Sequence, residues 1–117
     1  MKPFPKEYEL ESFFECEPSI LDKDVPWGYN QLTFRSESSN GSLKVLMEPG
    51  YETMHLSWMQ GSETVLELNL KGVLGLEIKN EAKLDTMIVS FRSNDVTDLV
   101  IKNRPLISVY WGYNDQL

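Results

Sequence analysis

The residues of this sequence with the means to do acid–base chemistry are one histidine and a few carboxylates that lie on stretches of alternating apolar residues. His55 stands between Met54 and Leu56, so on a strand its imidazole faces away from these two apolar side chains. The sequence fixes no carboxylate beside the ring, and it contains no nucleophile motif such as Gly-x-Ser-x-Gly. We therefore predict no catalytic residues and no enzyme, with an enzyme that uses His55 or a carboxylate pair as a lesser alternative.

The carboxylate pair in question is Glu67 and Glu77. A tight hairpin between Leu70 and Leu74 would place these two glutamates opposite each other. Facing carboxylates raise each other's pKa and can act as an acid and a base, but like charges directly opposite also destabilise a sheet. Lys79 lies diagonal to Glu67 and would relieve that repulsion. Three interpretations stay open, in order of preference: a solvated face, a pair that awaits a cation of a partner protein, and a catalytic pair.

Metal and cofactor sites are not expected. One cysteine, Cys16, and one histidine supply two of the four ligands that a zinc site usually needs, and a single cysteine forms no intrachain disulfide. The glycines are scattered singly at turns and form no phosphate-binding loop. We predict no metal and no cofactor.

The elements that must position these side chains are strands. Apolar residues recur at every second position in a series of short stripes, which is typical of half-buried strands. The stripes are Leu32/Phe34, Leu43/Val45/Met47, Met54/Leu56/Trp58, Leu66/Leu68/Leu70, Leu74/Leu76/Ile78, Met87/Val89/Phe91, Leu99/Ile101 and Ile107/Val109/Trp111. We predict an all-β fold: an antiparallel up-and-down meander of about eight strands that forms a sandwich or a strongly curled sheet or barrel.

Spacing between stripes predicts the register of each hairpin. If each stripe folds back on the next, Val45 lies opposite Leu56 in one hairpin. In a later hairpin Leu70 lies opposite Leu74. The same pairing puts Phe91 opposite Leu99, and Leu99 opposite Val109. Trp58 and Trp111 continue inward stripes and are predicted to lie in the core.

The chain is predicted to be one domain, residues 1–117, with an acidic N-terminal segment (1–30) that packs on the sheet and a meander (31–113). Leu10, Phe13 and Phe14 have helical spacing, although the stretch also suits a strand, and both structures stay open. Some outward positions are apolar and need a cover; these are Leu46, Ile88, Val100 and Tyr110. Residues 4–14 are the nearest cover, and a partner surface or a second subunit is the alternative.

Charge restricts the partners. The formal net charge is −7, and residues 1–26 carry seven acids against three lysines. Such a surface repels nucleic acid and anionic membranes and attracts a basic protein. The N-terminus has no apolar signal-peptide region and no stretch is long enough for a membrane helix, so we expect a cytoplasmic protein. The oligomeric state stays open.

Aromatic residues outside the stripes are candidates for a binding site. Trp27, Tyr29 and Tyr51 fall in irregular stretches, where they form either an exposed anchor for a partner or a lid over one end of the sheet.

Several stretches together resemble bacterial immunity proteins, the inhibitors encoded beside polymorphic or contact-dependent growth-inhibition toxins. The stretches are residues 13–18 (FFECEP), 26–30 (PWGYN), 68–78 (LNLKGVLGLEI), 90–93 (SFRS) and 105–111 (PLISVYW). The resemblance implies an inhibitor that binds the C-terminal effector domain of its toxin and covers the active site. Many such effectors are basic nucleases, which suits an acidic inhibitor.

Under this hypothesis, glutamates pair with cations of the toxin and aromatic residues anchor the interface. The candidate residues are Glu48, Glu52, Glu67, Glu77, Trp27, Tyr29 and Tyr51. The alternative function is a small β-barrel that carries an apolar ligand. Against the carrier, the stripes are short and bulky enough to fill the interior.

Overall fold

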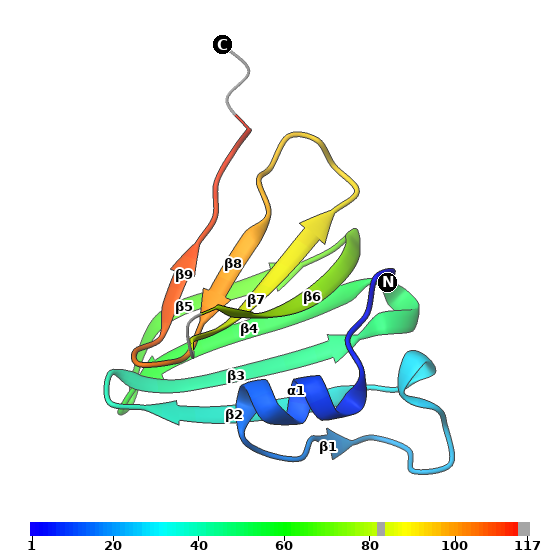
Figure 1. Ribbon diagram of the computed structural model, residues 1–117, viewed down its shortest axis with the longest axis horizontal. Coiled ribbons are helices and arrows are strands. Elements are labelled where there is room, and N and C mark those ends of the chain that lie inside the picture. Colours follow the sequence, from blue (N-terminus) through cyan, green and yellow to red (C-terminus); the bar gives the residue numbers. More distant parts are fainter. Residues whose placement is uncertain (82–83, 115–117) are drawn as a thin grey trace.

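The computed structural model describes residues 1–81 and 84–114, and in these residues it contains one α-helix, two 3-10 helices and nine strands (Figure 1). The helices are α1 (Glu7–Phe14), η1 (Trp27–Tyr29) and η2 (Pro49–Tyr51). The strands are β1 (Ser19–Ile20), β2 (Leu32–Ser38), β3 (Gly41–Glu48), β4 (Thr53–Gln60), β5 (Glu63–Leu70), β6 (Val73–Glu81), β7 (Leu84–Phe91), β8 (Leu99–Lys102) and β9 (Ser108–Tyr110).

The strands form two antiparallel sheets, in the orders β1-β2-β3-β4-β5 and β6-β7-β8-β9. Each strand is hydrogen-bonded to the next along the chain within its sheet, so the predicted meander is confirmed, and its eight stripes correspond to β2–β9. Figure 1 shows the second sheet crossing over the first. Apolar side chains of both sheets belong to one buried cluster. This is a sandwich of two sheets, and the described strands close no barrel.

The predicted hairpin between β5 and β6 is wrong. The chain changes sheets at this turn, where Gly72 has a positive φ of 64°. Strand β6 pairs with β7 instead, and an irregularity between Val73 and Gly75 leaves Val73 buried and Leu74 exposed. Period-two alternation indicates which face of a strand is buried. Strands β5 and β6 both turn the predicted face inward for most of their length. Alternation does not report which strand lies alongside, so it missed the change of sheet.

Other registers follow the prediction in part. Val45 does lie opposite Leu56. In the second sheet Val89 lies opposite Leu99, and Ile101 lies opposite Val109, so the predicted registers are wrong by two residues. A shift of two keeps each side chain on its face, and therefore Val89, Leu99 and Ile101 are still buried.

The spacing of apolar residues in the N-terminal segment suited either a helix or a strand, and residues 7–14 form a helix. Leu10, Phe13 and Phe14 are all buried, and α1 contacts β2, β6 and β7. Phe14 stacks on Phe34 of β2 with ring centroids 4.6 Å apart. Helix α1 therefore supplies core between the two sheets, at the side where β2 and β6 lie.

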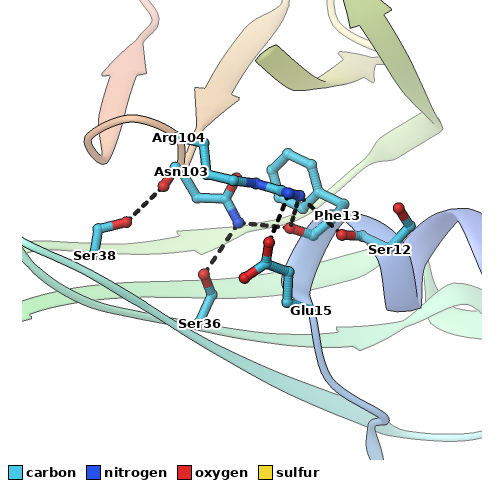
Figure 2. Close-up of polar contacts among 7 residues, drawn as sticks. All are labelled: Ser12, Phe13, Glu15, Ser36, Ser38, Asn103 and Arg104. Carbon is cyan, nitrogen blue, oxygen red and sulfur yellow. Dashed lines mark hydrogen bonds and ion pairs between the residues drawn. The ribbon is translucent and has the colours of Figure 1, made fainter. Parts of the chain in front are cut away.

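The two residues that directly follow β8, Asn103 and Arg104, connect helix α1 to the second sheet through hydrogen bonds (Figure 2). The Asn103 amide, 1% exposed, donates hydrogen bonds to the Phe13 carbonyl at 2.7 Å and to the Ser36 hydroxyl at 3.0 Å. The Arg104 guanidinium donates to the carbonyls of Ser12 and Phe13 and pairs with Glu15 at 2.7 Å. Carbonyls at a helix C-terminus lack partners within the helix, and Arg104 satisfies them.

Two predictions about buried aromatic residues need correction. Trp58 is only partly buried and donates its indole N–H to the Asn40 carbonyl at 3.0 Å. Trp111 is 37% exposed and stacks on Phe91 with centroids 5.4 Å apart, so it covers the sheet from outside the core. In the part of the chain described, no helix has the length and hydropathy needed to cross a membrane.

Candidate functional site

Helices η1 and η2 meet at one end of the sandwich and bring together four of the predicted site residues: Tyr29, Glu48, Tyr51 and Glu52. We call these four the tyrosine end. Tyr29 is 79% exposed and Tyr51 is 76% exposed, and both border a surface hollow of about 310 Å³ with Glu48. The hollow places two phenol groups and a carboxylate on one surface, which is suited to a protein partner with apolar and basic groups.

Local sequence determines where η2 places its side chains. Pro49 occupies the first turn, where its missing N–H removes no helical hydrogen bond. Glu52 ends the helix with a positive φ of 57°, a conformation that reverses the chain into β4. Tyr51 and Glu52 therefore project from a tight turn, adjacent to each other and outside the sheet.

Asn30 fixes the loop that carries Tyr29. Its buried amide donates to the carbonyls of Asp22 and Val25, at 2.5 and 2.9 Å. Its carbonyl oxygen accepts from the backbone N–H of Asp22 and of Gln31. Four hydrogen bonds on one side chain hold residues 22–31 in one shape, so Tyr29 is presented from an ordered loop.

Trp27 has the role of a lid and not of an exposed anchor. Its indole is partly buried against the core and makes an edge contact with Phe34, with centroids 6.1 Å apart. The two interpretations left open by the sequence thus divide among the aromatics: Trp27 covers the end of the sandwich, and Tyr29 and Tyr51 are exposed on it.

Glu52 is paired with a cation of this chain. Arg92 Nε donates to Glu52 Oε2 at 2.8 Å, and Arg92 Nη2 lies 2.7 Å from the same oxygen. This hydrogen bond lowers the pKa of the Glu52 carboxyl and raises the pKa of Arg92. Both groups line a groove of about 510 Å³ with Tyr29 and the N-terminal residues Met1 and Lys2. The pairing reduces the charge that Glu52 offers to a partner.

Glu67 lies on the outer face of the first sheet, bonded to His55 with Nε2 and Oε1 2.9 Å apart. The sequence prediction missed this pair. The available signal was the β4–β5 register, because Ser57 opposite Glu67 makes His55 a diagonal neighbour. His55 also lines a hollow of about 440 Å³ with Glu48, Asn69 and Lys71. The tyrosine end therefore borders His55, and Glu67 adjoins this hollow through its pair with His55.

Glu77 lies apart from the other candidates. It is on the outer face of the second sheet, opposite Ile88 of β7, whereas Glu67 faces Ser57. The predicted facing pair of Glu67 and Glu77 is therefore wrong, because β5 and β6 belong to different sheets, and no acid–base pair forms from these two residues.

Outward apolar residues in the second sheet form one row. Ile88, Val100 and Tyr110 lie opposite one another across β7, β8 and β9. Tyr110 is 72% exposed, and helix α1 buries its apolar side chains in the core instead of over this row. The prediction that residues 4–14 cover this row is therefore wrong, because their apolar side chains pack into the core.

Within residues 1–81 and 84–114, no group of three His, Cys, Asp or Glu side chains is placed to hold a metal ion. Cys16 Sγ donates to the Arg35 carbonyl at 2.9 Å. The surface from Tyr29 to Glu67 offers tyrosine hydroxyls and rings, the carboxylates of Glu48 and Glu67, one imidazole and the Lys71 amine.

No protein-family model matches the sequence, and no curated protein matches it either. The fold is shared with one chain of a solved structure, the contact-dependent growth inhibition toxin – immunity protein complex from Klebsiella pneumoniae 342. The similarity has a TM-score of 0.80 at 20% sequence identity and covers 95% of this chain and 96% of that chain. The fold of this protein is therefore one that occurs in a toxin–immunity complex, the kind of assembly to which the sequence resemblance pointed.

Proposed function

We propose that this chain is an immunity protein of a contact-dependent growth-inhibition system, which binds a cognate toxin domain and neutralises it without turnover. The observation that carries the proposal is the shared fold, which extends over 95% of the chain with a TM-score of 0.80. The net charge of −7 favours the role of inhibitor, because an acidic surface is complementary to an effector that binds phosphate groups. The resemblance inferred from the sequence supports the same role.

The toxin-binding surface in this proposal is the tyrosine end, extended through His55 to Glu67. Tyrosines are enriched among the residues that dominate binding energy, and Tyr29 and Tyr51 are more than three-quarters exposed. Glu48 lines both the hollow beside Tyr29 and Tyr51 and the hollow beside His55, so the surface from Tyr29 to His55 is continuous. Glu77 lies outside this surface.

The toxin in this proposal is a basic nuclease, and inhibition occurs by occlusion of its active site. Carboxylates at the rim of an interface steer a basic partner and raise the association rate, and salt screens this effect. We therefore expect the association rate to fall steeply between low and physiological ionic strength, while the dissociation rate changes little.

Co-expression tests the function directly. The C-terminal domain of the product of the gene immediately upstream is expressed with and without this protein, and cell survival and co-purification are scored. We expect survival and a 1:1 complex. If the cells do not survive and no complex forms, the proposal is refuted. The activity of the isolated toxin domain then shows whether it is a nuclease.

Tyrosine variants test the surface. Tyr29→Ala and Tyr51→Ala each should weaken toxin binding by about tenfold or more, the effect expected of a residue worth about 1.4 kcal/mol or more. Tyr113→Ala is the matched control, because Tyr113 is 84% exposed and lies beyond β9, bridged to Val96. Its dissociation constant should stay within about twofold of the original. Equal losses in all three variants would contradict the proposed surface.

A further inference from the structure

The four outer strands of the two sheets are protected from further pairing to different degrees. An edge strand exposes unpaired backbone N–H and C=O groups, and proteins block such edges with short strands, charge or a cover. Strand β1 has two residues and β9 has three. The start of β6 is covered by the N-terminal segment: Lys2 N–H bonds to the Leu74 carbonyl, and Leu76 N–H bonds to the Pro3 carbonyl, each at 2.8 Å.

Strand β5 is the least protected of the four edges, because it is long and its only charged residues are two glutamates. It is eight residues long and pairs only with β4 in the part of the chain that the structure describes. Its sequence, ETVLELNL, contains neither proline nor lysine. The register irregularity beside Trp58 and Met59 affects its first half, so Leu66 to Leu70 form a regular free edge. On this edge, alternate residues direct their N–H and C=O groups away from β4.

The side chains of β5 are also open to a partner. Five of its eight residues are exposed. On the inner side Leu66 and Leu68 are only partly buried, beside the partly buried Trp58. On the outer side Glu67 is exposed next to His55. A strand added to this edge would complete the burial of the two leucines and meet a carboxylate on its other face.

Charge distinguishes between two candidates for pairing with the β5 edge, a second copy of this chain and a segment of another protein. A second copy of this chain would bring the acidic side chains of both copies together on one strand pair, because β5 carries Glu63 and Glu67 and no basic residue. Like charges across a strand pair are destabilising, and opposite charges are stabilising. The occupant that fits is therefore an extended segment with apolar residues on one side and lysine or arginine on the other.

We propose that the free edge of β5 receives such a segment from the toxin, which extends the first sheet by one strand. This inference rests on the proposed function. Asn69 of β5 and Glu48 line the same hollow, so the edge continues the surface already assigned to the toxin. Main-chain hydrogen bonds supply affinity in this kind of recognition, and alternate side chains supply specificity.

Amide hydrogen exchange, resolved by residue with NMR, tests the inference on the unaltered protein, free and bound to the toxin C-terminal domain. In the free protein, the outward-facing amides among residues 66–70 should exchange rapidly, and those bonded to β4 slowly. In the complex, the rapid set should slow by at least about tenfold.

The outcomes separate the two proposals. A stable complex in which these amides still exchange rapidly would overturn strand addition and leave the immunity function intact. Absence of any complex would overturn the immunity function, and strand addition with it. Protection in the free protein that grows with its concentration would assign the edge to a second copy and overturn the inference.

Charge reversal provides a matched pair of variants. Glu67→Lys should weaken toxin binding about tenfold, because it places a cation beside the basic side of the incoming segment. Glu77→Lys makes the same change in net charge on the second sheet and should alter binding less than about twofold. Equal effects of the two variants would overturn the basic character assigned to the segment.

Discussion

Asn103 offers the sharpest test of how the N-terminal helix is held in the sandwich. Its side chain is 1% exposed and donates to the Phe13 carbonyl and the Ser36 hydroxyl (Figure 2). Asn103→Ala removes both hydrogen bonds and leaves the buried Ser36 hydroxyl without this donor. A lost net hydrogen bond costs about 1 kcal/mol, and a buried polar group that loses its partner adds about 1 kcal/mol. We expect the free energy of unfolding to fall by about 2–3 kcal/mol.

A second substitution, Asn103→Asp, tests whether the side chain at this position must be a hydrogen-bond donor. The substitution preserves the volume but replaces the donating amide with a carboxylate that faces the Phe13 carbonyl oxygen. Even with the Arg104 guanidinium nearby, a buried carboxylate that faces a carbonyl oxygen costs more than a missing hydrogen bond, so this variant should lose about 4 kcal/mol or more. The order of the two variants, and not only their size, follows from the position of the amide nitrogen.

Urea unfolding followed by fluorescence measures both variants, with midpoints converted to free energies at a common slope. At the size of this domain, 2–3 kcal/mol corresponds to a decrease in Tm of about 10 °C. Asn69→Asp is the control, because Asn69 is exposed on β5, and its stability should change by less than about 0.5 kcal/mol. An Asn103→Asp variant as stable as Asn103→Ala would contradict the assigned position of the amide nitrogen.

Two further predictions concern the edges of the tyrosine end. Because the hydrogen bond from Arg92 lowers the pKa of Glu52, this pair stabilises the fold above the ordinary glutamate value of 4.5, and the contribution is lost as pH falls through the lowered pKa. NMR titration of Arg92→Gln should show the Glu52 pKa risen toward 4.5; an unchanged pKa would contradict the assignment. A Cβ at Gly75 would lie 2.6 Å from the Lys2 carbonyl oxygen, so Gly75→Ala should detach the N-terminal segment and speed its proteolysis. Gly112→Ala meets no atom within 4 Å and is the control; equal proteolysis of both would count against this contact.

The candidate site was predictable in its residue types and less so in its grouping. Exposed tyrosines in irregular stretches, and an excess of acids, are visible in composition and spacing alone. The contact of η1 with η2 is not visible, because it joins residues about twenty positions apart through loops without periodicity. The ion pair of Glu52 with Arg92 spans 40 positions and two sheets, so no local pattern reports it.

The apolar pattern of the chain is enough to predict which face of nearly every strand is buried and that the strands follow one another as an antiparallel meander. Alternation of apolar side chains carries this information because a strand has a period of two residues. The point at which the meander divides is visible only in the folded domain. At Gly72 the chain leaves one sheet and enters another, and a strand that turns Leu66 and Leu68 inward can do so beside β6 or across from it. That division separates Glu67 from Glu77 and leaves β5 at an edge, because pairing between strands depends on packing of the whole domain and not on the local sequence.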